Sequence, residues 1–316
     1  MVKGDADKRL EHLLYAEQFI RAQGFKKPVL SRKRRILHHC YAYMRIMAET
    51  TRSSISSQTD NTPSGDTDSP ESSENIKDND RFRTSRWTAV SDNMMIMEKD
   101  PDTAKRDLHL EVPGHWTSTL FPELYGIAES FLLLLSQVIR LANERDITID
   151  QDSGGDLGLR EFTLRAKALE KSIYRLISTS SNAGPGTGTT TITVQAMYTA
   201  LLIFFYRRVH NLDAMLLQRN VLSVQTYLAQ IQQENHDSHR SAAMVWPAFV
   251  AACEALLPES QGFFAAWFEA MFEKTGLVSI SLVKGVCEFI WRRRMECPDG
   301  LSWPEVLKKG GRDLCT

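Results

Sequence analysis

The stretch that decides the fold reads WPAFVAACEALLP from Trp246 to Pro258, and GFFAAWF follows it from Gly262 to Phe268. Proline suits the first turn of a helix, where its missing N–H would have no partner, and Gly276 suits the left-handed position that ends a helix. Apolar residues keep helical spacing on both sides of Pro258. They are Phe249, Val250, Cys253, Leu256 and Leu257 before it, and Phe263, Phe264, Trp267, Phe268, Met271 and Phe272 after it. The pattern predicts two buried helices joined by almost no loop.

The same periodicity predicts helices along most of the chain. They cover residues 7–23, 31–50, 118–144, 160–178, 193–209, 211–233 and 279–295, with a short last helix at 302–305. In the helix 31–50 we expect Leu37, Cys40, Met44 and Met47 to face the core. The segment 193–209 is apolar nearly all round, which is typical of a central helix. Because no segment resembles a series of strands, we expect an all-α fold, a multi-helix bundle or array of helical hairpins.

A polar insertion interrupts this helical pattern. Residues 51–80 contain eight serines and seven acidic residues against two basic ones. Such a segment buries too little apolar surface to offset the entropy of ordering it. We therefore expect three parts: N-terminal helices with a basic cluster at 1–50, a disordered acidic, serine-rich linker at 51–86, and a helical regulatory domain at 87–316 that packs with residues 1–50 as one unit.

Composition excludes several classes of protein. The formal net charge of the 316 residues is -1, which gives no global attraction to nucleic acid or to an anionic membrane. The five cysteines are scattered and no pair has C-x2-C spacing, so we expect reduced thiols and no zinc cluster. The N-terminus lacks an apolar signal segment, and the longest apolar run, 200–206, is too short to span a membrane. We expect a soluble protein with no membrane partner, no metal and no cofactor.

A series of short motifs carries a family resemblance, because the motifs occur in a shared order over about residues 30–307. They are Leu37–Ile46, Asp107–Leu110, Trp116, Tyr125–Ile127, Glu129–Phe131, Leu134–Gln137, Arg140–Asn143, Ala168–Glu170, Ala200–Arg208 and Trp246–Ala255. The chain resembles the fungal-specific transcription factor domain of Zn2Cys6 proteins, in its arginine-metabolism-regulator (ARCA-like) branch. It departs from the pattern at Ala128, where the family more often has proline, and in lacking the six clustered cysteines of the DNA-binding module.

The resemblance implies a nuclear regulatory domain. Its partners would be proteins of the transcription machinery or a related transcription factor, and direct DNA binding has little support because no residue matches the zinc cluster. Two explanations stay open: a naturally cluster-less regulator, or a truncated gene model of a full Zn2Cys6 activator whose upstream exon is missing. No catalytic motif is present, so we expect no enzymatic activity.

Two groups of residues are candidate sites. The first is a basic cluster that could act as a nuclear localisation signal, formed by Lys26, Lys27, Arg32, Lys33, Arg34 and Arg35. The second is a set of aromatic residues that could line an apolar pocket for a metabolite or amino-acid effector, formed by Phe204, Phe205, Trp246 and Trp267. The alternative for the second group is ordinary core packing.

Overall fold

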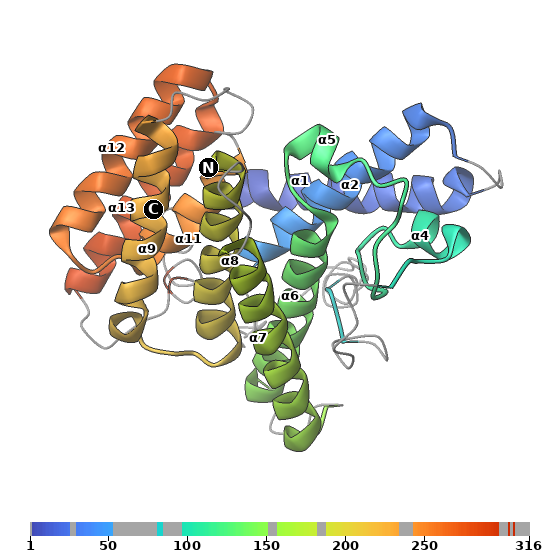
Figure 1. The fold of residues 1–316 in the computed structure, drawn as a ribbon, viewed down its shortest axis with the longest axis horizontal. Helices are drawn as coiled ribbons and strands as arrows, with labels where there is room; N and C mark the ends of the chain where they lie inside the picture. Colours follow the sequence, from blue (N-terminus) through green and yellow to red (C-terminus); the bar gives the residue numbers. More distant parts are fainter. Residues whose placement is uncertain are drawn as a thin grey trace, which may run out of the picture.

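Helix α8 (Gly188–Val209) runs through the centre of the computed structural model and packs against α6, α7, α9 and α11 (Figure 1). Its residues from Ala200 to Phe205 are all buried. A helix can be apolar on every side only when neighbours cover every side. The predicted central helix is confirmed.

The structure describes residues 2–25, 30–52, 81–84, 97–150, 157–181, 188–233, 243–296, 303 and 306. Helices form most of this part of the chain and loops connect them; the described residues also contain an isolated parallel bridge between Glu98 and His115. The remaining helices are α1 (Val2–Phe19), α2 (Arg32–Thr51), α4 (Pro101–Arg106), α5 (Phe121–Tyr125), α6 (Glu129–Asp150), α7 (Leu159–Ser181), α9 (Ala214–Gln233), α11 (Val245–Glu254), α12 (Pro258–Thr275) and α13 (Val278–Glu296), with a π-helical turn at Ile20–Gly24. The prediction of an all-α fold is confirmed for the described residues, and none of their helices is long and apolar enough to cross a membrane.

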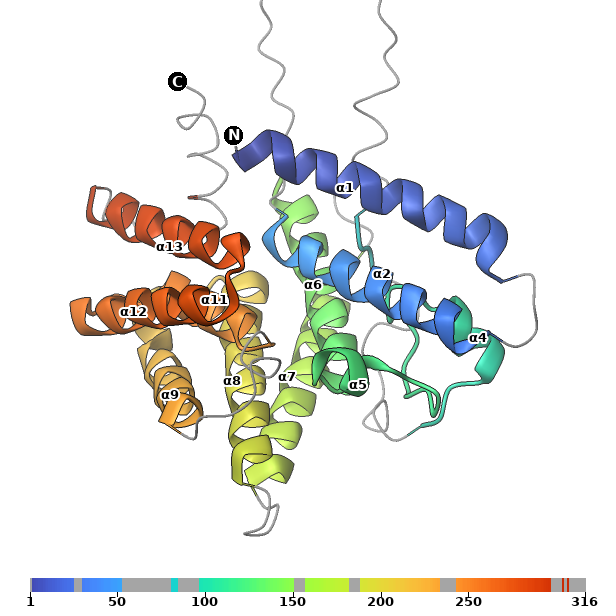
Figure 2. The same cartoon turned by 90° about the horizontal axis from the view of Figure 1, so that it is seen from above.

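The helices form three groups in space. α6, α7 and α8 lie between an N-terminal group, in which α1 and α2 run side by side, and a C-terminal group of α9, α11, α12 and α13 (Figure 2). α2 packs on α6, and α11 packs on both α8 and α13. The middle group therefore joins the two ends of the chain into one core.

The hairpin of α11 and α12 has the predicted form. Pro258 occupies the first turn of α12, and Gly276 ends it with a left-handed φ of 67°. Ala248 to Glu254 are all buried, and the small side chains let α11 lie close to its neighbours. Two residues of the predicted apolar stripe differ: Leu257 is 45% exposed and Phe272 is 39% exposed.

Two other helix predictions are wrong in detail. The predicted helix 118–144 is broken at Gly126, whose φ of 65° ends α5 before α6 begins at Glu129. In α2, Leu37 and Met44 are exposed, and the buried face instead carries His38, His39, Tyr41, Ala42, Arg45, Ile46, Glu49 and Thr50. The buried face of α2 is thus partly polar, which an apolar pattern could not reveal.

Most of the predicted linker, and all but Trp303 and Val306 of the predicted last helix, lie outside the described residues. Residues 81–84 fall inside the predicted linker, yet they are placed against α6 without forming a helix. Phe82 is only 2% exposed. We call residues 81–84 the strap.

Candidate functional site

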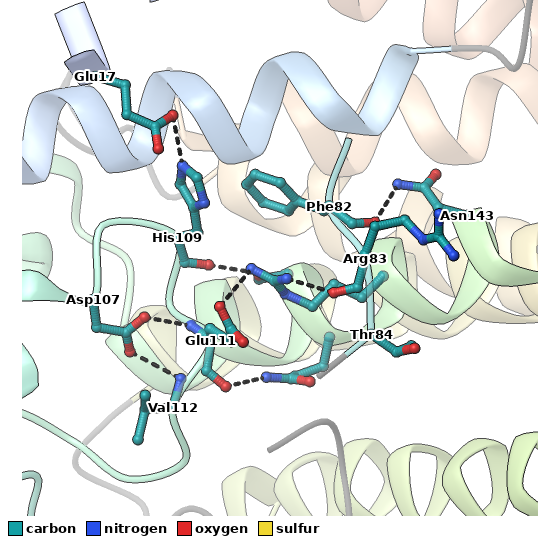
Figure 3. A network of polar contacts seen from close by, with 12 residues as sticks. Glu17, Phe82, Arg83, Thr84, Asp107, His109, Glu111, Val112 and Asn143 are labelled. Carbon is teal, nitrogen blue, oxygen red and sulfur yellow. Dashed lines mark hydrogen bonds and ion pairs between the residues drawn. The ribbon is translucent and has the colours of Figure 1, made fainter. Parts of the chain in front are cut away.

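A row of buried polar side chains on α6 lies where the N-terminal group meets the middle group. The row consists of Ser136, Gln137, Arg140, Asn143 and Glu144. Figure 3 shows Asn143 of this row beside Phe82. Buried polar groups are costly unless they form hydrogen bonds, so each needs a partner. The partners come from the strap and from the loop at residues 107–112.

The strap is held by three of these side chains. Arg140 Nη1 donates to the carbonyl oxygen of Arg83 at 2.6 Å, and Asn143 Nδ2 donates to that of Phe82 at 2.9 Å. Glu144 accepts from Arg83 Nε and from the backbone N–H of Thr84, both at 2.9 Å. The hydrogen bonds satisfy backbone groups that have no secondary structure to pair with.

Hydrogen bonds within the loop at residues 107–112, and hydrogen bonds from α6, hold the loop in place. Asp107 accepts hydrogen bonds from the backbone N–H groups of Glu111 at 2.6 Å and Val112 at 3.0 Å. Ser136 Oγ donates to the carbonyl oxygen of His109 at 2.6 Å, and Gln137 Nε2 donates to that of Glu111 at 2.8 Å. The loop therefore holds the His109 ring in one direction, toward α1.

The His109 ring contacts Glu17 on α1. His109 Nε2 lies 3.0 Å from Glu17 Oε2, and Tyr41 from α2 and Arg21 from the π-helical turn also donate to the Glu17 carboxylate. Burial raises the pKa of Glu17, but His109, Tyr41 and Arg21 outweigh burial and hold the pKa well below its ordinary value. Burial lowers the pKa of His109, although Glu17 raises it. Glu17 is thus a carboxylate at neutral pH.

A cavity of about 290 Å³ lies beside this contact. It is lined by Leu14, Glu17, Gln18 and Arg21, by Arg81 and Phe82 of the strap, and by His109 and Arg140. The guanidinium groups of Arg45 and Arg140 lie over the Phe82 ring, at 4.9 Å and 4.8 Å from its centroid. Four segments far apart in the sequence therefore build one polar cavity with an aromatic wall.

The cavity residues were not predicted as a site from the sequence. Their signal lies in α6, where Gln137, Arg140 and Glu144 follow at i, i+3 and i+7 within an otherwise apolar helix. Such spacing places polar groups on one helix face. It could have indicated a buried polar row, but not the strap that covers it.

The predicted basic cluster is only partly described, because Lys26 and Lys27 lie outside the described residues. Arg32 pairs with Glu123 on α5, and Arg35 Nη1 donates to the carbonyl oxygen of Ser118 at 2.8 Å. Ser31 caps α2 by accepting from the backbone N–H of Arg34. Arg32 and Lys33 are exposed, whereas Arg34 and Arg35 are half-buried against the body.

The predicted aromatic set is divided between different contacts. Phe204 lies 5.8 Å from Trp246 between ring centroids, Phe205 packs on His210, and Trp267 packs on Phe268. Phe204, Phe205 and Trp267 are at most 3% exposed. The structure brings only Phe204 and Trp246 together, and the cavity described above lies elsewhere.

Glu254, the polar residue at the end of α11, belongs to a second buried polar cluster. Glu254, fully buried, lies 3.0 Å from Arg207 Nε of α8 and 2.9 Å from Arg294 Nη2 of α13. Arg294 also donates to the carbonyl oxygen of Cys253. The cluster joins three helices, α8, α11 and α13.

In the described part of the chain, no three His, Cys, Asp or Glu residues are grouped so that they could hold a metal ion. Cys40, Cys253 and Cys287 are free thiols, and the last two are buried. Burial raises the pKa of the Cys253 thiol, and Cys287 beside it adds to the effect.

Comparison with known proteins gives a consistent result. The sequence profile described as fungal-specific transcription factor domain matches residues 1–316. The chain is also similar to arginine metabolism regulation protein II of Saccharomyces cerevisiae (strain ATCC 204508 / S288c), with 23% identity over 202 residues. This match covers 58% of the chain and 22% of the yeast protein. No solved structure matches the chain.

Proposed function

Since the chain belongs to the fungal-specific transcription factor domain family, we propose that it is the helical regulatory domain of a transcription regulator and acts through contacts with other proteins. The observation that carries this proposal is the family match along the whole chain, on a body whose N-terminal and C-terminal helices pack on one middle group of helices. Its partners are proteins of the transcription machinery or a related transcription factor. The family is one of regulatory domains, and we propose no enzymatic role.

A tethering experiment tests the proposal. The chain is fused to an unrelated DNA-binding domain, and expression of a reporter behind the matching DNA site is measured. We expect reporter expression to change, in either direction, with the fusion and not with the untethered chain. An unchanged reporter, with the fusion shown to occupy the DNA site, would refute a regulatory role.

DNA contact would then come from a partner or from a zinc cluster outside this sequence. A net charge of -1 and the engagement of Arg32 and Arg35 by Glu123 and Ser118 support this view. We expect affinity for duplex DNA weaker than the roughly 10⁻⁴ M typical of weak non-specific binders at physiological salt. Tighter binding in a fluorescence titration would contradict the proposal. An in-frame upstream exon with six clustered cysteines, found by mapping the transcript's 5′ end, would favour the truncated gene model.

The basic cluster is proposed as the signal that brings the chain to the nucleus. Because Arg35 binds the body, a test should leave Arg34 and Arg35 in place and change Lys26, Lys27, Arg32 and Lys33 to alanine. We expect a fluorescently tagged variant to lose nuclear accumulation. A matched variant with Lys167 and Lys171 of α7 changed to alanine should accumulate normally. Normal accumulation of both variants would contradict the assignment.

Effector sensing is the second candidate function, and the polar cavity is the observation that favours it. Its volume is at the lower end of small-molecule sites. The aromatic set around Phe204 and Trp246 remains a second, apolar prediction for the same function. Ligand-dependent stabilisation in a thermal-shift screen of metabolites is expected, since a ligand that binds only the folded state raises its stability. Substituting Phe204→Leu or Arg140→Lys distinguishes the two locations.

A further inference from the structure

Arginines are prominent among the described residues that line the cavity between α1, the strap and α6. Three of these lining residues are arginines, Arg21, Arg81 and Arg140, and the carboxylate among them is that of Glu17. Glu17 already accepts hydrogen bonds from Arg21, Tyr41 and His109. The Glu17 carboxylate is therefore already engaged by three of its neighbours.

Arg140 is a buried cation of this wall, and its ion-pair partner is distant. The residue is 4% exposed, and its Nε and Nη2 form no hydrogen bond within the described residues. Its ion-pair partner Glu111 lies 3.7 Å away and is one-third exposed. Other buried cations have closer carboxylates: Lys99 lies 3.0 Å from Asp107, and Arg208 lies 3.2 Å from Asp146.

We propose that this cavity is a binding site for a small organic anion, whose carboxylate or phosphate group pairs with the guanidinium group of Arg140. Guanidinium presents two parallel N–H groups that match these oxyanions. Leu14 and the Phe82 ring supply apolar surface for the rest of the molecule. The cavity volume of about 290 Å³ is at the lower end of small-molecule sites, which fits a short carboxylic acid.

The Arg21 side chain indicates where an anion would enter the cavity. It is half exposed, while Arg140 is buried, so an anion would enter past Arg21 and reach Arg140 at the inner wall. Burial lowers the pKa of Arg140 against the effect of Glu111, Asp107 and Glu49, and a bound anion would relieve this cost. The proposal names a ligand class for the second candidate function, effector sensing. It rests on that function only for the biological role of the bound anion.

Thermal unfolding of the full chain tests binding directly. The probes are propionate, succinate and inorganic phosphate, each compared with chloride at equal ionic strength, and alanine serves as the zwitterionic counterpart of propionate. We expect a saturable rise in Tm with at least one of the three anions and a smaller rise with alanine. Stabilisation by phosphate alone would assign the site to phosphate-bearing ligands, and stabilisation by the two acids would assign it to carboxylates. No rise beyond that with chloride would overturn the proposal.

Three variants locate the site. Arg140→Lys keeps the positive charge but loses the two parallel N–H groups of the guanidinium. Arg21→Gln removes a cation at the entrance. Each variant should weaken anion binding on the order of tenfold, as expected for lost hydrogen bonds to a charged group. Glu17→Gln removes the opposing carboxylate and should strengthen it. Arg293→Gln, which removes a partly exposed cation on α13, should have no effect. Thermal unfolding without ligand shows whether Arg140→Lys folds. If it does not fold, anion binding by Arg21→Gln tests the location of the site.

Two further results would contradict the assignment. Equal binding by wild type, Arg21→Gln and Arg140→Lys would place the anion elsewhere. Tighter binding of alanine than of propionate, lost in Glu17→Gln, would make the ligand a zwitterion. Because binding is measured on the purified chain, it can succeed when the tethered reporter fails, and the two proposals can be refuted separately.

Discussion

Glu254, the last residue of α11, places its Oε1 3.0 Å from Nε of Arg207 on α8, and both side chains are buried. Arg294 of α13 reaches the other carboxylate oxygen at 2.9 Å. Burial raises the pKa of Glu254, and Arg294 and Arg207 lower it. The pair and its third member fix the relative positions of three helices at one point of the core.

Removing the Glu254 charge should therefore take its carboxylate away from the buried Arg207 and the mostly buried Arg294. We expect Glu254→Gln to lower the free energy of unfolding by about 3–5 kcal/mol, as for other buried ion pairs that lose one partner. Urea unfolding measures the loss. Glu296→Gln is the control, because Glu296 pairs with Arg293 at the surface and should cost less than about 1 kcal/mol. Equal losses in the two variants would show that the buried cluster has no special role.

The strap gives a second prediction. Phe82 is buried and lies under two guanidinium groups, so Phe82→Ala should lower the free energy of unfolding by about 3–5 kcal/mol. Phe19→Ala on α1 is the matched control, since Phe19 is 70% exposed and its removal should change stability by less than about 0.5 kcal/mol. Urea unfolding of both variants measures the two changes in the free energy of unfolding. If Phe82→Ala were as stable as Phe19→Ala, the strap would not contribute to the folded core.

Helix positions follow from sequence where the buried face is apolar. The hairpin at Pro258 and the central α8 are of this kind, because both bury nearly continuous apolar surface. The face of α2 was predicted wrongly for the opposite reason. Its core side carries Arg45 and Glu49, which become buried only because they pair with each other and lie near Phe82.

The cavity could not be predicted because its residues belong to separate segments. Nothing near Phe82 in the sequence indicates burial, since the strap follows a polar, serine-rich stretch and gains its partners only from α6. His109 lies in a motif that the family resemblance includes, but its orientation depends on a hydrogen bond from Ser136, 27 positions away. Contacts of this kind depend on the tertiary fold and not on local periodicity.

Gly114 gives a third prediction, from backbone geometry. Its φ is +108°, and a Cβ atom there would lie 2.7 Å from the carbonyl oxygen of Met97, inside the bridge that joins residues 97–99 to His115. Gly114→Ala should lower the free energy of unfolding by at least about 1–3 kcal/mol, because neither the angle nor the space suits a side chain.

The control for this prediction is Gly262→Ala. Gly262 lies within α12 and a Cβ there would meet nothing within 4 Å, so alanine should stabilise the helix by about 0.5–1 kcal/mol. Thermal unfolding of the two variants should therefore shift Tm in opposite directions. A rise in Tm for Gly114→Ala would show that the bridge relaxes without cost.

The fourth prediction concerns pH. Burial lowers the pKa of His38, His39, His109 and His210. The unfolded chain, with histidine pKa values near about 6.5, then binds more protons than the folded chain at mildly acidic pH, so the free energy of unfolding falls as pH decreases below about 6.5.

Carboxyl groups modify this dependence at lower pH. Arg45 and Arg52 hold the pKa of Glu49, against burial, below its ordinary value; Glu17 and Glu144 are also lowered, so their contribution is lost as pH falls below about 4.5. Burial raises the pKa of Glu254, which acts in the opposite direction, since the folded state then binds its proton first. Four histidines against one such carboxyl make net loss of stability the expected result between pH 7.5 and 5.5.

Urea unfolding at these two pH values measures the loss, and His109→Gln identifies one source of it. The glutamine amide can still donate to Glu17 but cannot take up a proton, so the variant should lose less stability than the wild type between pH 7.5 and 5.5. The difference should not exceed about 1.4 kcal/mol per pH unit, the limit for one proton. His12→Gln on the exposed side of α1 should lose as much as the wild type. If His109→Gln and wild type lost stability equally, the pKa of His109 would be the same in the folded and the unfolded chain, and its protonation would not oppose folding.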